Sequence, residues 1–121
     1  MNASQQEDFI LRQVAGVAAA LGRILGLRQA GAAEAARVEL ERAYALLLGA
    51  RSDLLRRVDA MTAAALLDAP DAIRALARLA AEEAEQEPDV DRRAILRRRG
   101  AALEAEARRR EAGPRGDEPT S

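Results

Sequence analysis

Residues 10–31 read ILRQVAGVAAALGRILGLRQAG, and this stretch decides the fold. Its large apolar residues recur at intervals of three and four, which is the period of one face of an α-helix. A second apolar row lies beside the first, so we expect the helix to bury a wide face against more than one neighbour. The first row is Ile10, Val14, Val17, Leu21 and Ile24, and the second is Leu11, Ala18 and Leu25.

The same periodicity predicts helices along most of the chain. Ser4 and Glu7 have capping-box spacing, which places the first helix start near Gln5. Gly31 ends that helix, and so short a connection makes the next helix antiparallel. The further helices are expected over 33–48, 52–58, a short span after Asp59, 70–86 and 89–110, with Ser52, Asp59 and Asp89 as caps and Gly49 as a stop.

Each of the three longer helices that follow has one apolar row that we expect to face the core. Gly100 lies in the last row, where it permits a close approach of two backbones, and we explain Gly16, Gly22 and Gly26 in the same way. Glu104 with Arg108 and Glu106 with Arg110 are expected to pair along the last helix. The rows are Ala36, Leu40, Ala43 and Leu47; Ile73, Leu76, Ala80 and Ala84; and Leu96, Gly100, Leu103 and Ala107.

Composition agrees with an all-helical chain. Alanine and leucine dominate, whereas there is one phenylalanine, one tyrosine and no tryptophan among 121 residues. Strands favour the aromatic and β-branched residues that are scarce here. We therefore predict an all-α fold in which antiparallel helical hairpins form a small bundle, as one domain over residues 1–111. The polar, glycine- and proline-containing segment 112–121 has nothing to bury and is predicted to be a disordered tail.

The residue types present restrict the chemistry. The chain has no histidine and no cysteine, so carboxylates are its only ordinary metal ligands and general bases. Ser4 and Ser52 are expected helix caps, and neither has a histidine to activate it. We therefore predict no catalytic residue, no cofactor, no metal and no enzyme activity.

The segment from Phe9 to Leu27 is apolar enough to raise the question of a membrane span. Arg12, Gln13 and Arg23 interrupt it, and each arginine near a bilayer centre would cost about 2.5–3.5 kcal/mol. We interpret the segment as a buried helix of a soluble protein and expect a cytoplasmic location without membrane contact.

One stripe of the first helix is a candidate partner-binding surface. Arg12, Gly16, Ala19 and Arg23 lie opposite the packing row, so that two small residues are framed by two arginines. We interpret this stripe as a docking surface for a protein or peptide partner or for a second copy of the chain. An ordinary solvated helix face is the alternative.

Two charged runs follow one another near the C-terminal end. All 19 basic residues are arginine, yet the formal net charge is only −1, which gives no global attraction to nucleic acid. We expect the acidic run to face the arginines of the last helix and to hold no metal. The acidic run is Glu82, Glu83, Glu85, Glu87, Asp89 and Asp91; the basic one is Arg92, Arg93, Arg97, Arg98, Arg99, Arg108, Arg109 and Arg110.

Two resemblances add to this interpretation. The segment from Leu27 through Tyr44 resembles the turn and second helix of a tetratricopeptide unit, although the aromatic and proline positions of the full repeat are missing. The chain also resembles a family of small bacterial helical proteins of unassigned function. That family opens like Asp8-Phe9-Ile10-Leu11-Arg12, continues like residues 21–28, and has a turn glycine like Gly31 and a helix end like residues 46–49. This resemblance implies a tetratricopeptide-like fold and transfers no activity.

Elimination leaves an interaction module. The leading hypothesis is a non-catalytic helical scaffold that binds a protein, a peptide or its own copy through a helix face. A homodimer would add burial to a small, alanine-rich core. The alternative is nucleic-acid or anionic-ligand binding through the arginine-rich last helix, with nucleic acid disfavoured because no aromatic residues are interleaved for stacking.

Overall fold

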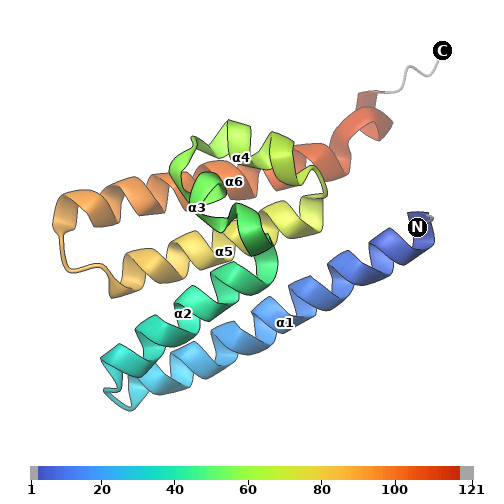
Figure 1. The fold of residues 1–121 in the computed structure, drawn as a ribbon. Helices are drawn as coiled ribbons and strands as arrows, with labels where there is room; N and C mark the ends of the chain where they lie inside the picture. Colours follow the sequence, from blue (N-terminus) through green and yellow to red (C-terminus); the bar gives the residue numbers. More distant parts are fainter. Residues whose placement is uncertain (1–2, 118–121) are drawn as a thin grey trace.

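The computed structural model describes the backbone of residues 3–117 and the side chains of residues 5–113, and the described part is helical without a β-strand. Two antiparallel hairpins lie side by side, α1 with α2 and α5 with α6, and the short helices α3 and α4 connect them across one side (Figure 1). The elements are α1 (Ala3–Gln29), α2 (Ala33–Leu48), the 3-10 turn η1 (Gly49–Arg51), α3 (Ser52–Arg57), α4 (Ala60–Leu67), α5 (Pro70–Gln86) and α6 (Val90–Asp117). The all-α prediction is confirmed.

The turns form where the sequence predicts them. Gly31 has φ 77° between α1 and α2, and Gly49 has φ 60° at the end of α2. Both values lie in the left-handed region that glycine adopts without a steric penalty. The second hairpin turns at residues 87–89, where the Asp89 side chain accepts hydrogen bonds from the main-chain amides of Asp91 and Arg92 at 2.9 and 3.4 Å.

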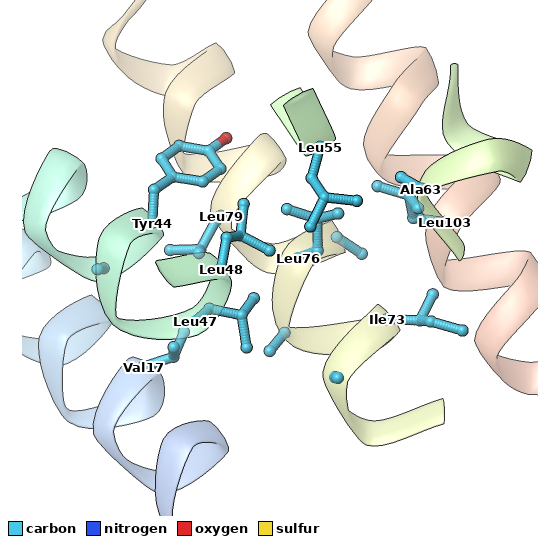
Figure 2. Packing of buried hydrophobic residues seen from close by; sticks show 14 of the residues in the cluster. Val17, Tyr44, Leu47, Leu48, Leu55, Ala63, Ile73, Leu76, Leu79 and Leu103 are labelled. Carbon is cyan, nitrogen blue, oxygen red and sulfur yellow. The ribbon is translucent and has the colours of Figure 1, made fainter. Parts of the chain in front are cut away.

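Helix α5 is the centre of the bundle, because it contacts α1, α2, α4 and α6. Its buried residues include Ile73, Leu76 and Leu79, which lie in one cluster with residues from the five other α-helices (Figure 2). All the residues of the three predicted inner rows of α2, α5 and α6 are buried. Burial of this face, and not intrinsic helix propensity alone, holds such helices in place.

Two predicted helix caps are wrong, although both helices begin at or close to their predicted starts. α1 already begins at Ala3, so Ser4 lies inside the helix; its side chain is outside the described residues. Ser52 has helical φ and ψ at the start of α3 and makes no capping hydrogen bond, because η1 leads directly into that helix. The cap at Asp59 is confirmed, since its carboxylate accepts from the main-chain amide of Thr62 at 3.4 Å.

The last helix extends beyond its predicted end near Arg110. Helical backbone continues to Asp117 across a break at Gly113, where φ is 11° and ψ is −133°. Residues 118–121 lie outside the described residues. The disorder of the segment 112–121 therefore stays a prediction.

The glycines divide into packed and open positions. A Cβ built at Gly100 would stand 3.2 Å from the main-chain oxygen of Ala77, so α5 and α6 approach closely there, as predicted. At Gly22 and Gly26 a Cβ would meet nothing within 4 Å. The prediction that close helix packing explains these two glycines is wrong, because both lie on the open side of α1.

Candidate functional site

Helix α1 buries one side against α2 and α5 and leaves the opposite side uncovered by the described residues. Its first predicted row is buried or partly buried, with Val17 and Ile24 almost completely inaccessible. The second row is exposed, with Leu11 at 53% and Leu25 at 49%. The prediction of a buried second row is therefore wrong, because both neighbours of α1 pack on its other side.

The uncovered side forms a continuous apolar strip, which we call the outer face of α1. It contains no charged side chain between its two leucines and consists mainly of alanine and glycine. Its members follow one another at intervals of four and three, so that they lie in one line along the helix. The outer face of α1 comprises Leu11, Ala15, Ala18, Gly22 and Leu25, all exposed.

The predicted docking stripe lies at the border between this face and α2. Arg12 and Ala19 are exposed. Arg23 instead pairs with Glu39 of α2 at 2.8 Å, and this hydrogen bond holds the pKa of the Glu39 carboxyl below its usual value. A Cβ at Gly16 would stand 2.7 Å from Leu46 Cδ2, so this glycine packs against α2. Two of the four stripe residues, Gly16 and Arg23, thus already contact α2.

Among the described residues, one helical segment, Gln5–Gln29, is long and apolar enough to cross a membrane. In the structure, 17% of its most apolar 18-residue window is buried. The prediction that this helix is buried holds for one side only. Polar contacts fix the segment to α2, because Gln13 donates to the main-chain oxygen of Leu46 at 3.1 Å in addition to the Arg23 pair.

The acidic run faces the arginines of α6, as predicted, and also those of other helices. Glu85 lies 3.8 Å from Arg97 and Glu87 lies 3.2 Å from Arg92, which closes the second hairpin. Arg28 at the end of α1 reaches Glu82 at 3.5 Å and Glu85 at 3.3 Å. The acidic run therefore joins the two hairpins, and no group of carboxylates in the described residues is arranged to hold a metal ion.

A polar network that the sequence did not indicate lies between α2, α3 and α5. The buried Tyr44 hydroxyl donates to Glu83 at 2.6 Å, and the Arg56 guanidinium lies 3.8 Å from the centroid of the Tyr44 ring. In Figure 2 this ring lies at the edge of the apolar cluster, with its hydroxyl directed away from Leu48 and Leu79. Burial, followed by the adjacent Glu83 carboxylate, raises the pKa of Tyr44. The phenol is thus a fixed hydrogen-bond donor.

The arginines of α6 have unequal surroundings. Arg93 donates to the main-chain oxygens of Glu87 and Pro88, and Arg99 donates to those of Leu55 and Val58. Arg98 is exposed and makes no ion pair or hydrogen bond to any described residue. Seven of the eight arginines of the predicted basic cluster therefore bind carboxylates or main-chain oxygens of the described residues, and Arg98 does not.

The two predicted pairs along α6 are confirmed, and one of them is larger than predicted. Glu104 and Arg108 lie 3.4 Å apart. The largely buried Glu106 accepts from Arg110 at 2.8 Å and also from Arg109. Hydrogen bonds from Arg109 and then Arg110 lower the pKa of Glu106 to about 2.

No family model, no curated protein and no solved structure matches the chain. The function is therefore inferred from the geometry of the structure. Within the described residues, every buried side-chain polar atom has a hydrogen-bond partner, so none points to a missing ligand. The features left unexplained by packing are the outer face of α1 and the free arginines near α3 and α6.

Proposed function

We propose that this protein is a non-catalytic helical interaction module that self-associates through the outer face of α1. One observation carries the proposal: an uncharged strip from Leu11 to Leu25 is exposed along about 21 Å of helix, at 1.5 Å per residue. Large exposed apolar surfaces that a soluble fold leaves uncovered are typical of partner-binding sites.

The spacing of the strip favours another helix as the partner. Positions 11, 15, 18, 22 and 25 alternate steps of four and three, which is the heptad period of helices that pack side by side. Alanine and glycine at the middle positions let two helix backbones approach closely. A lipid surface is a poorer match, because such small side chains bury little area and the flanks carry both signs of charge.

The order of residues favours a second copy in the antiparallel direction. A two-fold interface requires that the same patch fit itself. With Ala18 at the two-fold axis, Leu11 of one copy lies opposite Leu25 of the other. Asp8 and Arg12 of one copy then approach Arg23 and its partner Glu39 of the other, a set without net charge. The predicted docking stripe would form the polar border of the interface.

Light scattering over a range of protein concentrations tests the proposal. A single helix pair is smaller than the standard interface of about 800 Å² per partner, so we expect a dimer that dissociates on dilution. Ala18→Glu places two carboxylates at the two-fold axis and should give a monomer with an unchanged helical circular dichroism spectrum. Ala45→Glu, at an exposed position of α2, is the matched control and should leave the dimer intact.

Two results would contradict the proposal. One is a monomer at every accessible concentration, and the other is an equal loss of dimer in both variants. Binding of the unmodified chain to neutral lipid vesicles in place of self-association would assign the outer face to a membrane.

The wider interpretation belongs to the same proposal. The two hairpins, joined by contacts of α5 with α1 and α2, support a tetratricopeptide-like arrangement. We also propose membership of the small bacterial helical family, a cytoplasmic location and the absence of enzyme activity. Nucleic acid remains the disfavoured partner, since several arginines of α6 already bind carboxylates or main-chain oxygens.

A further inference from the structure

A pocket of about 580 Å³ opens between α3, α5 and α6, away from the outer face of α1. Five of the residues that line it are arginines, whereas two are carboxylates, Glu83 and Asp59. We call it the arginine pocket. Its arginines are Arg56 and Arg57 from α3 and Arg92, Arg98 and Arg99 from α6.

Two of the five arginines are neutralised by carboxylates. Arg56 binds Glu41 through two hydrogen bonds, at 2.7 and 3.1 Å. Arg92 lies 3.2 Å from Glu87. Both guanidinium groups also lie 3.5 Å from Glu83, whose carboxylate additionally accepts from Tyr44. Three carboxylates, Glu41, Glu83 and Glu87, thus stand against these two arginines, so one negative charge is left to offset part of the charge of the other three.

The other three arginines have no carboxylate partner among the described residues. Arg57 and Arg98 are exposed and form no hydrogen bond or ion pair with any described residue. Arg99 uses two guanidinium nitrogens on neutral main-chain oxygens. The remaining carboxylate, Asp59, is engaged with Thr62, whose hydroxyl and main-chain amide both donate to it. Asp59 keeps its negative charge, so with Glu41, Glu83 and Glu87 four carboxylates stand against five arginines, and the pocket has an excess of one positive charge.

Part of the pocket lining is apolar. Leu76 and Leu96 are buried at the pocket, and Ile95 is 54% exposed beside them. Small-molecule sites typically combine such an apolar lining with a few convergent polar groups. Guanidinium groups bind carboxylate and phosphate oxygens in particular, because their N–H donors match these groups two at a time.

We infer that the arginine pocket binds a small amphipathic anion, which has a carboxylate or phosphate head and a short apolar body. The head lies between Arg57 and Arg98, with the charge of Arg99 behind it, and the body covers Ile95 and Leu96. A pocket without an exposed aromatic ring suits such a ligand better than a nucleic-acid strand.

A nitrogen-15 NMR titration of the full chain tests the inference. The probes are octanoate, octyl phosphate, inorganic phosphate and octyltrimethylammonium, each kept below its aggregation concentration. We expect saturable shifts at the amides of residues 56–60 and 95–99 with one or both octyl anions and none with the ammonium compound. The tighter of the two octyl anions identifies the head group, and inorganic phosphate should bind more weakly because it lacks the apolar body.

Paired substitutions distinguish binding in the arginine pocket from general electrostatic attraction of anions to the protein. Arg57→Gln with Arg98→Gln should raise the dissociation constant by about tenfold, as expected when exposed guanidinium contacts to an anion are lost. Arg37→Gln with Arg78→Gln removes the same charge at exposed positions outside the pocket and should leave it unchanged.

Any one of three results would overturn the inference. These are equal weakening of binding by both pairs of substitutions, equal binding of the ammonium compound, and the absence of saturable shifts. The titration is repeated on Ala18→Glu, so that failure of self-association and failure of anion binding are observed separately.

Discussion

The guanidinium of Arg99 donates a hydrogen bond to the main-chain oxygen of Leu55 at 2.6 Å, and so joins α6 to the end of α3. A second bond reaches the oxygen of Val58 at 2.5 Å. The last carbonyls of a helix lack partners within the helix, and a cation there also meets the negative end of the helix dipole. A single side chain thus fixes a short helix that would not be stable alone.

Replacing Arg99 by methionine should therefore destabilise the protein. Arg99→Met keeps an apolar stem and removes both charge-assisted hydrogen bonds, so we expect the free energy of unfolding to fall by about 2 kcal/mol. Urea unfolding followed by circular dichroism measures the change. Arg98→Met is the control, because Arg98 makes no described contact, and it should change the value by less than about 0.5 kcal/mol. Equal effects would show that Arg99 does not hold α3.

A methyl group at Gly100 should reduce stability even though alanine favours helices. Its Cβ would press on the main-chain oxygen of Ala77 at 3.2 Å, and two packed backbones yield little. We expect Gly100→Ala to lower the free energy of unfolding by about 1–2 kcal/mol.

Gly26→Ala is the matched control, because its Cβ would enter open space. It should raise the free energy of unfolding by about 0.5–1 kcal/mol when measured at a concentration where the chain is monomeric. If Gly100→Ala stabilised the protein as much as Gly26→Ala does, the close approach of α5 and α6 at Gly100 would be contradicted.

The single tyrosine should ionise at a higher pH than an ordinary tyrosine does. Burial beside Glu83 raises the pKa of Tyr44 above its ordinary value of 10.0, and the absorbance of the phenolate near 295 nm reports this titration. Because the folded state keeps the proton that the unfolded state releases, stability should fall as the pH rises above about 10. The same titration in concentrated urea should return to the ordinary value. If Tyr44 of the folded chain also titrated at this ordinary value, the buried hydrogen bond to Glu83 would be contradicted.

The Glu106 carboxylate should make the fold acid-sensitive. Its pKa is about 2 in the folded protein against an ordinary 4.5, so its contribution is fully present above about pH 4.5 and is lost as the pH falls toward 2. Glu106→Gln should be less stable than the unmodified chain at pH 6, and the difference should shrink as the pH approaches 2.

The partners of Glu106 provide the comparison for this result. The double substitution Arg109→Gln with Arg110→Gln removes the two donors, and it should abolish the same pH dependence of stability. If the difference between Glu106→Gln and the unmodified chain stayed constant between pH 6 and 2, the lowered pKa would be wrong.

The positions of the longer helices could be predicted because they depend on local rules. Apolar spacing placed α2 and α5, and the glycines at 31 and 49 ended helices because glycine adopts positive φ without a steric penalty. The caps were less predictable. Asp59 and Ser52 look equivalent in the sequence, but η1 runs directly into α3 and leaves no extended residue at Ser52 for a cap.

The candidate sites could be predicted only in part. The stripe from Arg12 to Arg23 lies where the spacing placed it, yet Arg23 and Gly16 are occupied by α2. Nothing in the sequence indicated the arginine pocket beyond the basic run, because Arg57 and Arg98 lie 41 positions apart and line the same pocket only in the folded chain.

By itself the sequence determined the all-helical class, the hairpin turns and which row of each later helix is buried. Those properties follow from backbone preferences and from a period that repeats every three to four residues. Tertiary structure alone decided which of two apolar rows on α1 is covered, because α2 and α5 pack on one side only. It also decided which arginines are free, since that depends on carboxylates and carbonyls brought close from distant parts of the chain.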